Sequence, residues 1–230
     1  MGRMKRVSHP GLVVHVVNRG NNRQKIFHEE DDYRRYLSVV QHYKKKFGFH
    51  LFAFCLMTNH VHLLIRVGEK SVSKIMQSIT LAHTKHYHFK YSGCGHVWQG
   101  RFKSPVVSDD DHLLTVMAYI EQNPVRAKMV PRVDDYRWSS FKMNASFREF
   151  PLVDRRENPV WPTLGRDDRE RITAYRKLVE GRIGRDRLEE IVKSTRGQGH
   201  FMSERYRKRL AALIPEKRRP GRPRTRGIKV

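Results

Sequence analysis

Two histidines one residue apart, His60 and His62, are the first residues of this chain whose types and spacing could do chemistry. They lie in an apolar run over residues 52–67, which is too short to cross a membrane and predicts two buried strands meeting near Asn59. Because residues two apart in a strand share a face, both imidazoles should project together, with Val61 facing the other way. Two converging imidazoles supply half of a divalent metal site. The alternative is two polar side chains on the exposed face of a sheet.

The second candidate for chemistry is Tyr119, in a helix expected from the pattern of residues 111–123. The apolar face of that helix is formed by Leu113, Leu114, Met117 and Ile120. At 100° per residue Tyr119 falls away from the centre of this face, so we expect it outside the main core contact of the helix.

Asn123 lies one turn after Tyr119 on the same side of the helix, and its amide oxygen could help to complete a metal site. The alternatives are a packed core tyrosine and an ordinary helix-end residue before Pro124.

These groups together could carry out phosphodiester transesterification. A divalent metal held by His60 and His62, with Asn123 as a weaker oxygen ligand, would polarise the scissile phosphate. Water or substrate oxygens would fill the other positions, as suits Mg²⁺ or Mn²⁺. Tyr119 would then attack phosphorus and form a covalent phosphotyrosine. No glycine-rich phosphate loop of the P-loop kind occurs in the sequence.

A rival metal site could be built from a second, denser group of ligand types. These residues fall in or just after an expected basic helix, where a solvated helix face is the ordinary explanation. They are His83, His86, His88, Cys94 and His96.

The charge of the chain points to a polyanionic partner. The formal net charge is +24, from 47 Lys and Arg against 23 Asp and Glu, which favours nucleic acid. We find no long apolar segment, no clear basic amphipathic helix and no secretory signal, so a membrane partner is not expected. Two distant cysteines, Cys55 and Cys94, fit a reducing cytoplasm and give no support for a cysteine-based zinc finger. We therefore expect a cytoplasmic protein, and the family resemblance given below implies a bacterial one that associates with the nucleoid through its function.

The expected elements alternate between strands and helices over the first 140 residues. Their order is β-α-β-β-α-β-α, with a hairpin in the middle, which predicts an α+β fold: a ferredoxin-like antiparallel sheet with covering helices. Gly48 is placed to end the first helix, and Ser71 or Ser73 to cap the second. The expected strands are 12–17, the pair within 52–67, and 102–107, and the expected helices are 31–47, 71–91 and 111–123.

The composition changes after about residue 150, which predicts three parts: a catalytic domain over 1–145, a basic helical extension over 146–214, and a flexible basic tail over 215–230. Helical segments are expected near 168–181, 185–193 and 203–213. The last 30 residues hold eleven Lys or Arg against two acidic residues. Within the tail, Gly221-Arg222-Pro223 resembles an AT-hook, which would place Arg222 and Arg224 in the minor groove of an A·T-rich duplex. The alternative is a solvated cationic tail.

Taken in order, five short segments make the chain resemble the REP-associated tyrosine transposases, one-tyrosine members of the HUH single-strand nuclease superfamily. The segments cover roughly residues 8–142 and are His15-Val-Val-Asn-Arg-Gly20, Phe54-Cys-Leu-Met-Thr-Asn-His-Val-His-Leu-Leu64, Val97-Trp-Gln-Gly-Arg-Phe102, Tyr119-Ile-Glu-Gln-Asn-Pro-Val-Arg-Ala127 and Asp135-Tyr-Arg-Trp-Ser-Ser140. The resemblance implies a ferredoxin-like catalytic domain with His60 and His62 as metal ligands and Tyr119 as the nucleophile.

In that family the tyrosine joins the 5′ phosphate of single-stranded DNA and releases a 3′ hydroxyl. The usual substrates are imperfect hairpins of repeated extragenic palindromes with a short tetranucleotide at the foot. Insertion-sequence relatives have a glutamine one helical turn after the tyrosine, where this chain has the shorter Asn123.

Candidate DNA contacts come from basic and aromatic side chains near these segments. The aromatic rings of Trp98 and Phe102 could stack on unpaired bases, although a large aromatic beside a strand is more often core. The alternative to an endonuclease and strand transferase is a non-catalytic, hairpin-binding regulatory protein that uses the same basic surface, as monomer or homodimer. The basic candidates for phosphate contact are Arg19, Arg23, Arg101 and Lys103.

Overall fold

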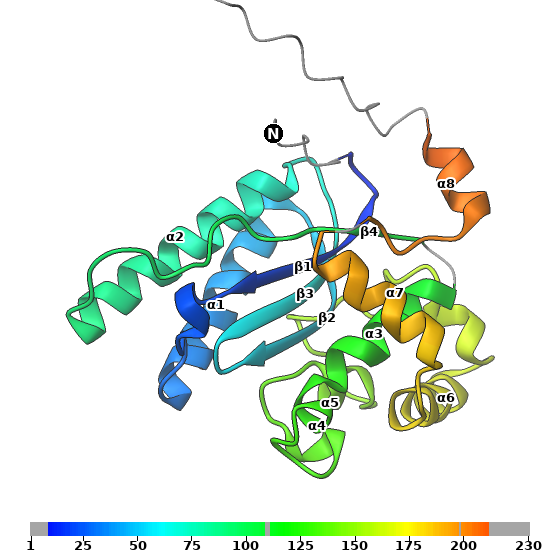
Figure 1. Ribbon diagram of the computed structural model, residues 1–230. Coiled ribbons are helices and arrows are strands. Elements are labelled where there is room, and N and C mark those ends of the chain that lie inside the picture. The colour runs from blue at the N-terminus through cyan, green and yellow to red at the C-terminus, as the bar shows by residue number, and fades with distance from the viewer. Residues whose placement is uncertain (1–8, 109–110, 198, 212–230) are drawn as a thin grey trace, which may run out of the picture.

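The computed structural model describes residues 9–108, 111–197 and 199–211. Its centre is one antiparallel sheet with the strand order β2-β3-β1-β4 (Figure 1). The strands are β1 (Val13–Arg19), β2 (His50–Met57), β3 (His60–Arg66) and β4 (Val106–Val107). The predicted α+β fold and the central hairpin are both confirmed.

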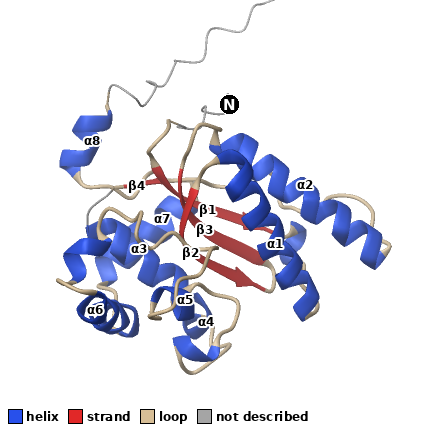
Figure 2. Ribbon diagram, turned by 180° about the vertical axis from the view of Figure 1, so that it is seen from behind, coloured by secondary structure: helices blue, strands red, loops and turns tan. Residues whose placement is uncertain are grey.

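Helices cover both faces of this sheet, as Figure 2 shows from behind. On one face α1 (Glu30–Phe47) and α2 (Val72–Tyr91) pack on the side chains of Val14, Val16 and Leu63. On the other face α3 (Asp111–Glu121) packs on β2, and α6 (Asp168–Glu180) and α7 (Arg185–Thr195) pack on α3. The remaining short elements are η1 (Asn21–Arg23), α4 (Asn123–Arg126), η2 (Val133–Asp135), α5 (Phe141–Asn144), η3 (Trp161–Leu164) and α8 (Glu204–Leu210).

Local sequence signals explain where the two long helices begin and end. Gly48 ends α1 in the left-handed region, at φ 63°, where glycine pays no steric cost. The Ser71 side chain accepts a hydrogen bond from the backbone N–H of Lys74 and so caps the N-terminus of α2. Both predicted signals are confirmed.

Two predicted elements were wrong in extent, and a proline explains each case. The strand expected over 102–107 is regular only at β4, although Lys103 still pairs with Val17 as an isolated bridge. Pro105 accepts a hydrogen bond from the N–H of His15 but has no N–H to return, which interrupts the ladder. The helix expected over 111–123 ends at Glu121 and resumes as α4, because Pro124 cannot donate within the helix.

The predicted basic helices after residue 150 are present as α6, α7 and α8. Beyond α7 the chain returns to the sheet, where Phe201 forms a parallel bridge with Val107 beside β4. Among the described residues, no helix is both long and apolar enough to cross a membrane. The tail residues Arg222 and Arg224 lie outside the described residues.

A buried carboxyl, Glu121, ties α3 to its neighbours two residues after Tyr119. Its oxygens accept hydrogen bonds from the Ser140 hydroxyl at 2.6 Å, the Tyr175 hydroxyl at 2.7 Å and the Asn144 amide at 3.0 Å. Burial raises the pKa of Glu121 to about 7, and these three donors work in the opposite direction.

Glu121 therefore gives a prediction about stability and pH. Its pKa is higher in the folded chain than the ordinary 4.5, so the folded state loses stability relative to the unfolded state as pH rises from 4.5 through 7. A Glu121→Gln variant cannot ionise at this position. Its free energy of unfolding should therefore rise relative to wild type as pH increases through this range, by a total on the order of 3 kcal/mol above pH 7. Urea unfolding at pH 5 and pH 8 measures the change. The exposed Glu190→Gln is the control, and equal pH dependence in all three proteins would contradict the prediction.

Candidate functional site

The two histidines project from β3 toward α3, as the strand alternation predicted. Val61 and Leu63 pack in the core on the α1 and α2 side, which confirms that they face away from the histidines. Across the sheet, Arg19 pairs with His60, and Val17 pairs with His62. The imidazole centroids of His60 and His62 lie 5.0 Å apart. Rigid paired strands therefore hold both rings side by side on one face.

Both imidazoles are neutral at pH 7 and so keep a lone pair for a ligand. Burial, followed by the positive charge of Arg19, lowers the pKa of His60 to about 4. Burial also holds the pKa of His62 well below its ordinary range, and His60, His15 and nearby arginines add to that effect. The Nε2 atom of His62 is buried and has no hydrogen-bond partner within the described part of the chain. A buried, unpaired imidazole nitrogen fits a metal ligand.

Tyr119 lies beside His62, but it is buried, contrary to the expectation that it would lie outside the main core contact of its helix. Its side chain is 6% exposed, and its ring centroid lies 6.0 Å from that of His62 and 5.9 Å from that of His15. The expectation failed because α3 is buried on every side: the sheet lies on one side, and α6 and α7 lie on the other.

Arg126 places a positive charge beside the Tyr119 ring, and the sequence patterns assigned no role to this residue. Its guanidinium carbon lies 4.7 Å from the centroid of the Tyr119 ring. Burial raises the pKa of Tyr119, while the charge and a hydrogen bond of Arg126, and then the charges of Arg19 and Arg196, oppose that rise. Arg126 follows Tyr119 by seven residues, two helical turns, and this spacing could have found it.

Asn123 lies next to the tyrosine in sequence, but its amide nitrogen is engaged by its own helix. It donates to the carbonyl oxygens of Tyr119 at 2.8 Å and Ile120 at 3.2 Å. Within the described residues, no group of three or more His, Cys, Asp or Glu side chains could hold a metal ion. The protein therefore offers two imidazoles here, and the role of the Asn123 oxygen as a third ligand stays a prediction.

Three of the four basic candidates in the described residues lie near the histidines. Arg19 pairs with His60 across the sheet. Lys103 pairs with Val17, and Val17 pairs on its other side with His62. Arg23 follows in η1, with φ 59°, and its carbonyl accepts a hydrogen bond from the Asn59 amide at 3.1 Å.

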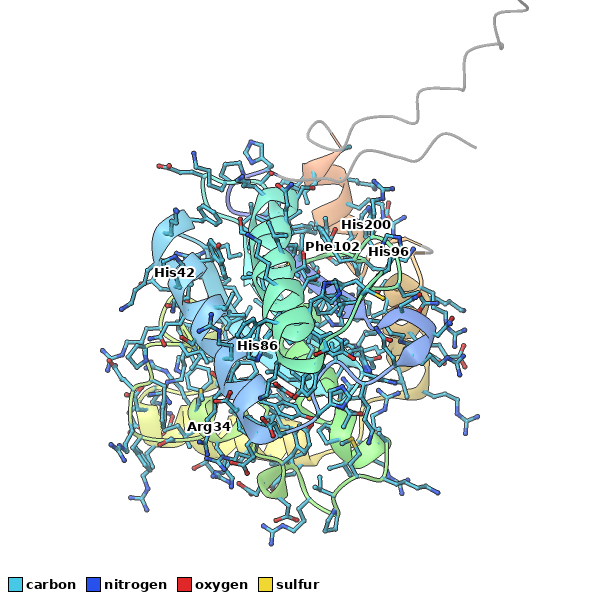
Figure 3. All side chains as sticks on the ribbon, turned by 90° about the vertical axis from the view of Figure 1, so that its left-hand side faces the viewer. Arg34, His42, His86, His96, Phe102 and His200 are labelled. Atoms are coloured by element: carbon cyan, nitrogen blue, oxygen red, sulfur yellow. The ribbon has the colours of Figure 1, made fainter. Side chains whose placement is uncertain are left out.

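Arg101 instead lines a groove on the opposite face of the sheet, beside α2. The cavity has a volume of about 630 Å³. The Trp98 indole N–H donates to Thr84 at 3.0 Å, and both predicted stacking aromatics are partly buried against the core. Figure 3 looks onto this side and labels Phe102 beside α2. The groove lining includes Asn18, Ser71, Ser73, Lys74, Gln77, Thr80, Trp98, Gly100, Arg101 and Phe102.

The rival histidine group is not a metal site within the described residues. His83 is buried and shares a hydrogen bond with the carbonyl oxygen of Ile26 at 3.0 Å. His86 contacts the buried carboxylate of Asp32 at 3.3 Å, in the layer of α1 and α2. His86 therefore joins α2 to α1, and His83 joins α2 to the segment just before α1.

The fold agrees with the resemblance found in the sequence: a ferredoxin-like sheet carries His60 and His62 on the face that is covered by the helix of Tyr119. The sequence profile of the IS200-like transposases matches residues 8–123. That match spans half of the 230 residues, and the chain belongs to the IS200-like transposase family.

Two relatives make the comparison more specific. A protein of Haemophilus influenzae that carries the name REP-associated tyrosine transposase is 28% identical over 131 residues, which is 50% of this chain and 70% of that protein. A solved structure of a REP-associated tyrosine transposase bound to a REP hairpin matches with a TM-score of 0.55 and 21% identity, over 67% of this chain and 91% of that one. The predicted resemblance to this group is confirmed, and the structural match supports the fold.

Proposed function

We propose that this transposase is a metal-dependent single-stranded DNA endonuclease and strand transferase that works through a covalent 5′-phosphotyrosine. The observation that carries the proposal is the position of Tyr119, whose ring lies beside both the neutral His62 and the guanidinium of Arg126. A protein that only binds hairpins needs no tyrosine buried against two neutral histidines.

The reaction would exchange one phosphodiester for another. The Tyr119 hydroxyl oxygen attacks the scissile phosphorus and loses its proton, a Tyr–O–P bond forms, and the P–O3′ bond breaks. The leaving 3′ oxygen takes up a proton and becomes a 3′ hydroxyl. In the reverse direction a 3′ hydroxyl attacks the phosphotyrosine and releases the tyrosine. The phosphoester bond is conserved, so strand joining needs no nucleoside triphosphate.

The residues around the tyrosine would supply charge and position. His60 and His62 would hold a divalent ion, Mg²⁺ or Mn²⁺, with Asn123 as a candidate third ligand, and such an ion would act as a Lewis acid toward a phosphoryl oxygen. Arg126 and Arg19 oppose the effect of burial on the Tyr119 pKa and would also attract the scissile phosphate. Burial keeps the unreacted tyrosine protonated.

The substrate we propose is single-stranded DNA that folds into REP-type hairpins. The solved relative is bound to a REP hairpin, and this chain has the same fold and a net charge of +24. Arg19, Arg23 and Lys103 would contact the strand near Tyr119. Arg101 would contact DNA on the opposite face of the sheet, and the tail arginines Arg222 and Arg224 would contact an A·T-rich duplex.

A covalent adduct tests this function directly. Labelled single-stranded hairpin DNA is incubated with the full chain and Mn²⁺ or Mg²⁺, and the products are resolved on a denaturing protein gel. We expect a labelled protein band that disappears when EDTA removes the metal. Tight binding without an adduct, across several hairpins and both metals, would favour the regulatory hairpin binder.

A further inference from the structure

Each histidine of the site already uses its Nδ1 atom in a hydrogen bond. His60 Nδ1 lies 2.6 Å from Asn59 Oδ1, and His62 Nδ1 lies 2.9 Å from Nε2 of a third histidine, His15. A neutral imidazole carries one proton, so whichever nitrogen holds it leaves the other with the lone pair. The partners of the two Nδ1 atoms therefore decide whether the two Nε2 atoms can bind a metal ion.

The direction of the hydrogen bond at His60 follows from the partner's other contact. The amide nitrogen of Asn59 donates to the carbonyl of Arg23 at 3.1 Å, so its Oδ1 atom is the one that faces His60. An amide oxygen only accepts, and His60 must carry its proton on Nδ1. The backbone carbonyl of Asn59 also accepts from the N–H of Gly20 at 2.8 Å, which fixes the turn that presents the side chain.

The contact between His15 and His62 is buried on both sides. The two side chains are 1% and 3% exposed, and their ring centroids lie 5.1 Å apart. His15 Nδ1 and His62 Nε2 are buried without a hydrogen-bond partner among the described residues. One proton lies between His15 Nε2 and His62 Nδ1. If His62 supplies it, its Nε2 has a free lone pair on the face shared with His60 and Tyr119.

We propose that His15 and Asn59 are positioning residues that hold His62 and His60 in the Nδ1–H form, with both Nε2 lone pairs directed to one divalent cation. The inference rests on the proposed function for the presence of the cation. It explains why a polar side chain is buried in β1 opposite Leu64, where an apolar residue would otherwise fit. His15 itself is no ligand in this arrangement, because its Nε2 atom accepts the proton of His62 and its Nδ1 atom then carries the proton of the neutral ring.

The proton positions can be observed without any catalytic readout. In the full chain labelled with ¹⁵N-histidine, two-bond nitrogen–proton couplings distinguish Nδ1–H from Nε2–H imidazoles. We expect both His60 and His62 to be Nδ1–H before metal is added. Addition of Mn²⁺ alone should broaden these two ring signals first. An Nε2–H form of His62 in the wild-type chain would overturn the proposal.

Variants then separate orientation from simple packing. His15→Phe fills the space without an acceptor and should weaken Mn²⁺ binding about 10–100-fold, the usual cost of losing an outer partner of a ligand. His15→Gln restores an acceptor and should recover most of the affinity. Asn59→Ala should weaken Mn²⁺ binding by a similar factor, because His60 loses its acceptor. Asn59→Asp keeps an acceptor oxygen and should not weaken Mn²⁺ binding in this way.

The control for packing is His83→Phe, which removes an equally buried histidine from the α1 and α2 side. It should bind Mn²⁺ as wild type does. Unchanged Mn²⁺ affinity in His15→Phe, or no recovery in a folded His15→Gln, would overturn the role of His15. If the chain forms no DNA adduct but the couplings and affinities follow expectation, the proposed function fails and this inference stands.

Discussion

A Tyr119→Phe variant is expected to form no covalent DNA adduct and to bind hairpin DNA within about twofold of wild type. The substitution removes only the hydroxyl that would attack phosphorus. The ring that packs beside His15 and His62, under Arg126, remains in place, so folding and the basic surface should be preserved. A denaturing gel with labelled hairpin measures the adduct, and fluorescence anisotropy measures binding at a stated salt concentration.

Tyr36→Phe provides the matched control. Tyr36 is fully buried on the α1 and α2 side, and its hydroxyl has no hydrogen-bond partner within the described residues. Its removal should leave adduct formation unchanged. An adduct in Tyr119→Phe would mean that another residue is the nucleophile. Equal loss of binding and cleavage would mean that Tyr119 holds the DNA or the fold instead.

The sequence predicted those parts of the site that depend on local periodicity. Alternation in β3 placed His60 and His62 on one face, and the helical pattern placed Tyr119 on a helix that covers the sheet. The register between β1 and β3, in contrast, could not be predicted from local periodicity. The contact of His15 with His62 joins residues 47 positions apart, and only the paired strands determine it. No local pattern carries that information.

The burial of Tyr119 is a second feature that a local sequence pattern could not predict. A helical wheel describes one apolar face, but α3 is packed between the sheet and two later helices, α6 and α7. Those helices come from a segment whose sequence resembled the catalytic family least. The pattern of α3 alone could not show that its second face is also covered, and therefore it placed the tyrosine too near the solvent.

Arg126 is the residue whose loss should matter most after the tyrosine itself. The Arg126→Ala variant is expected to lower the single-turnover rate of adduct formation by about 10²–10³, the usual cost of removing one group that stabilises charge in a transition state. The reason is electrostatic: burial disfavours the charged phenolate of Tyr119, and Arg126 is the first of the groups that oppose it. The rate is measured at saturating hairpin and Mn²⁺, so that weaker DNA binding does not contribute.

Two further variants decide whether this effect is specific. Arg126→Lys keeps the charge but not the planar guanidinium, and it should recover part of the rate. Arg132→Ala removes another exposed arginine after α4 and should lower only DNA affinity. A rate unchanged in Arg126→Ala would show that the guanidinium packs on the ring without assisting the reaction. Equal losses of this saturating rate in Arg126→Ala and Arg132→Ala would mean that the effect is not specific to Arg126. A loss confined to Arg126 would place the positive charge needed for attack on α4, directly after the helix that carries the nucleophile.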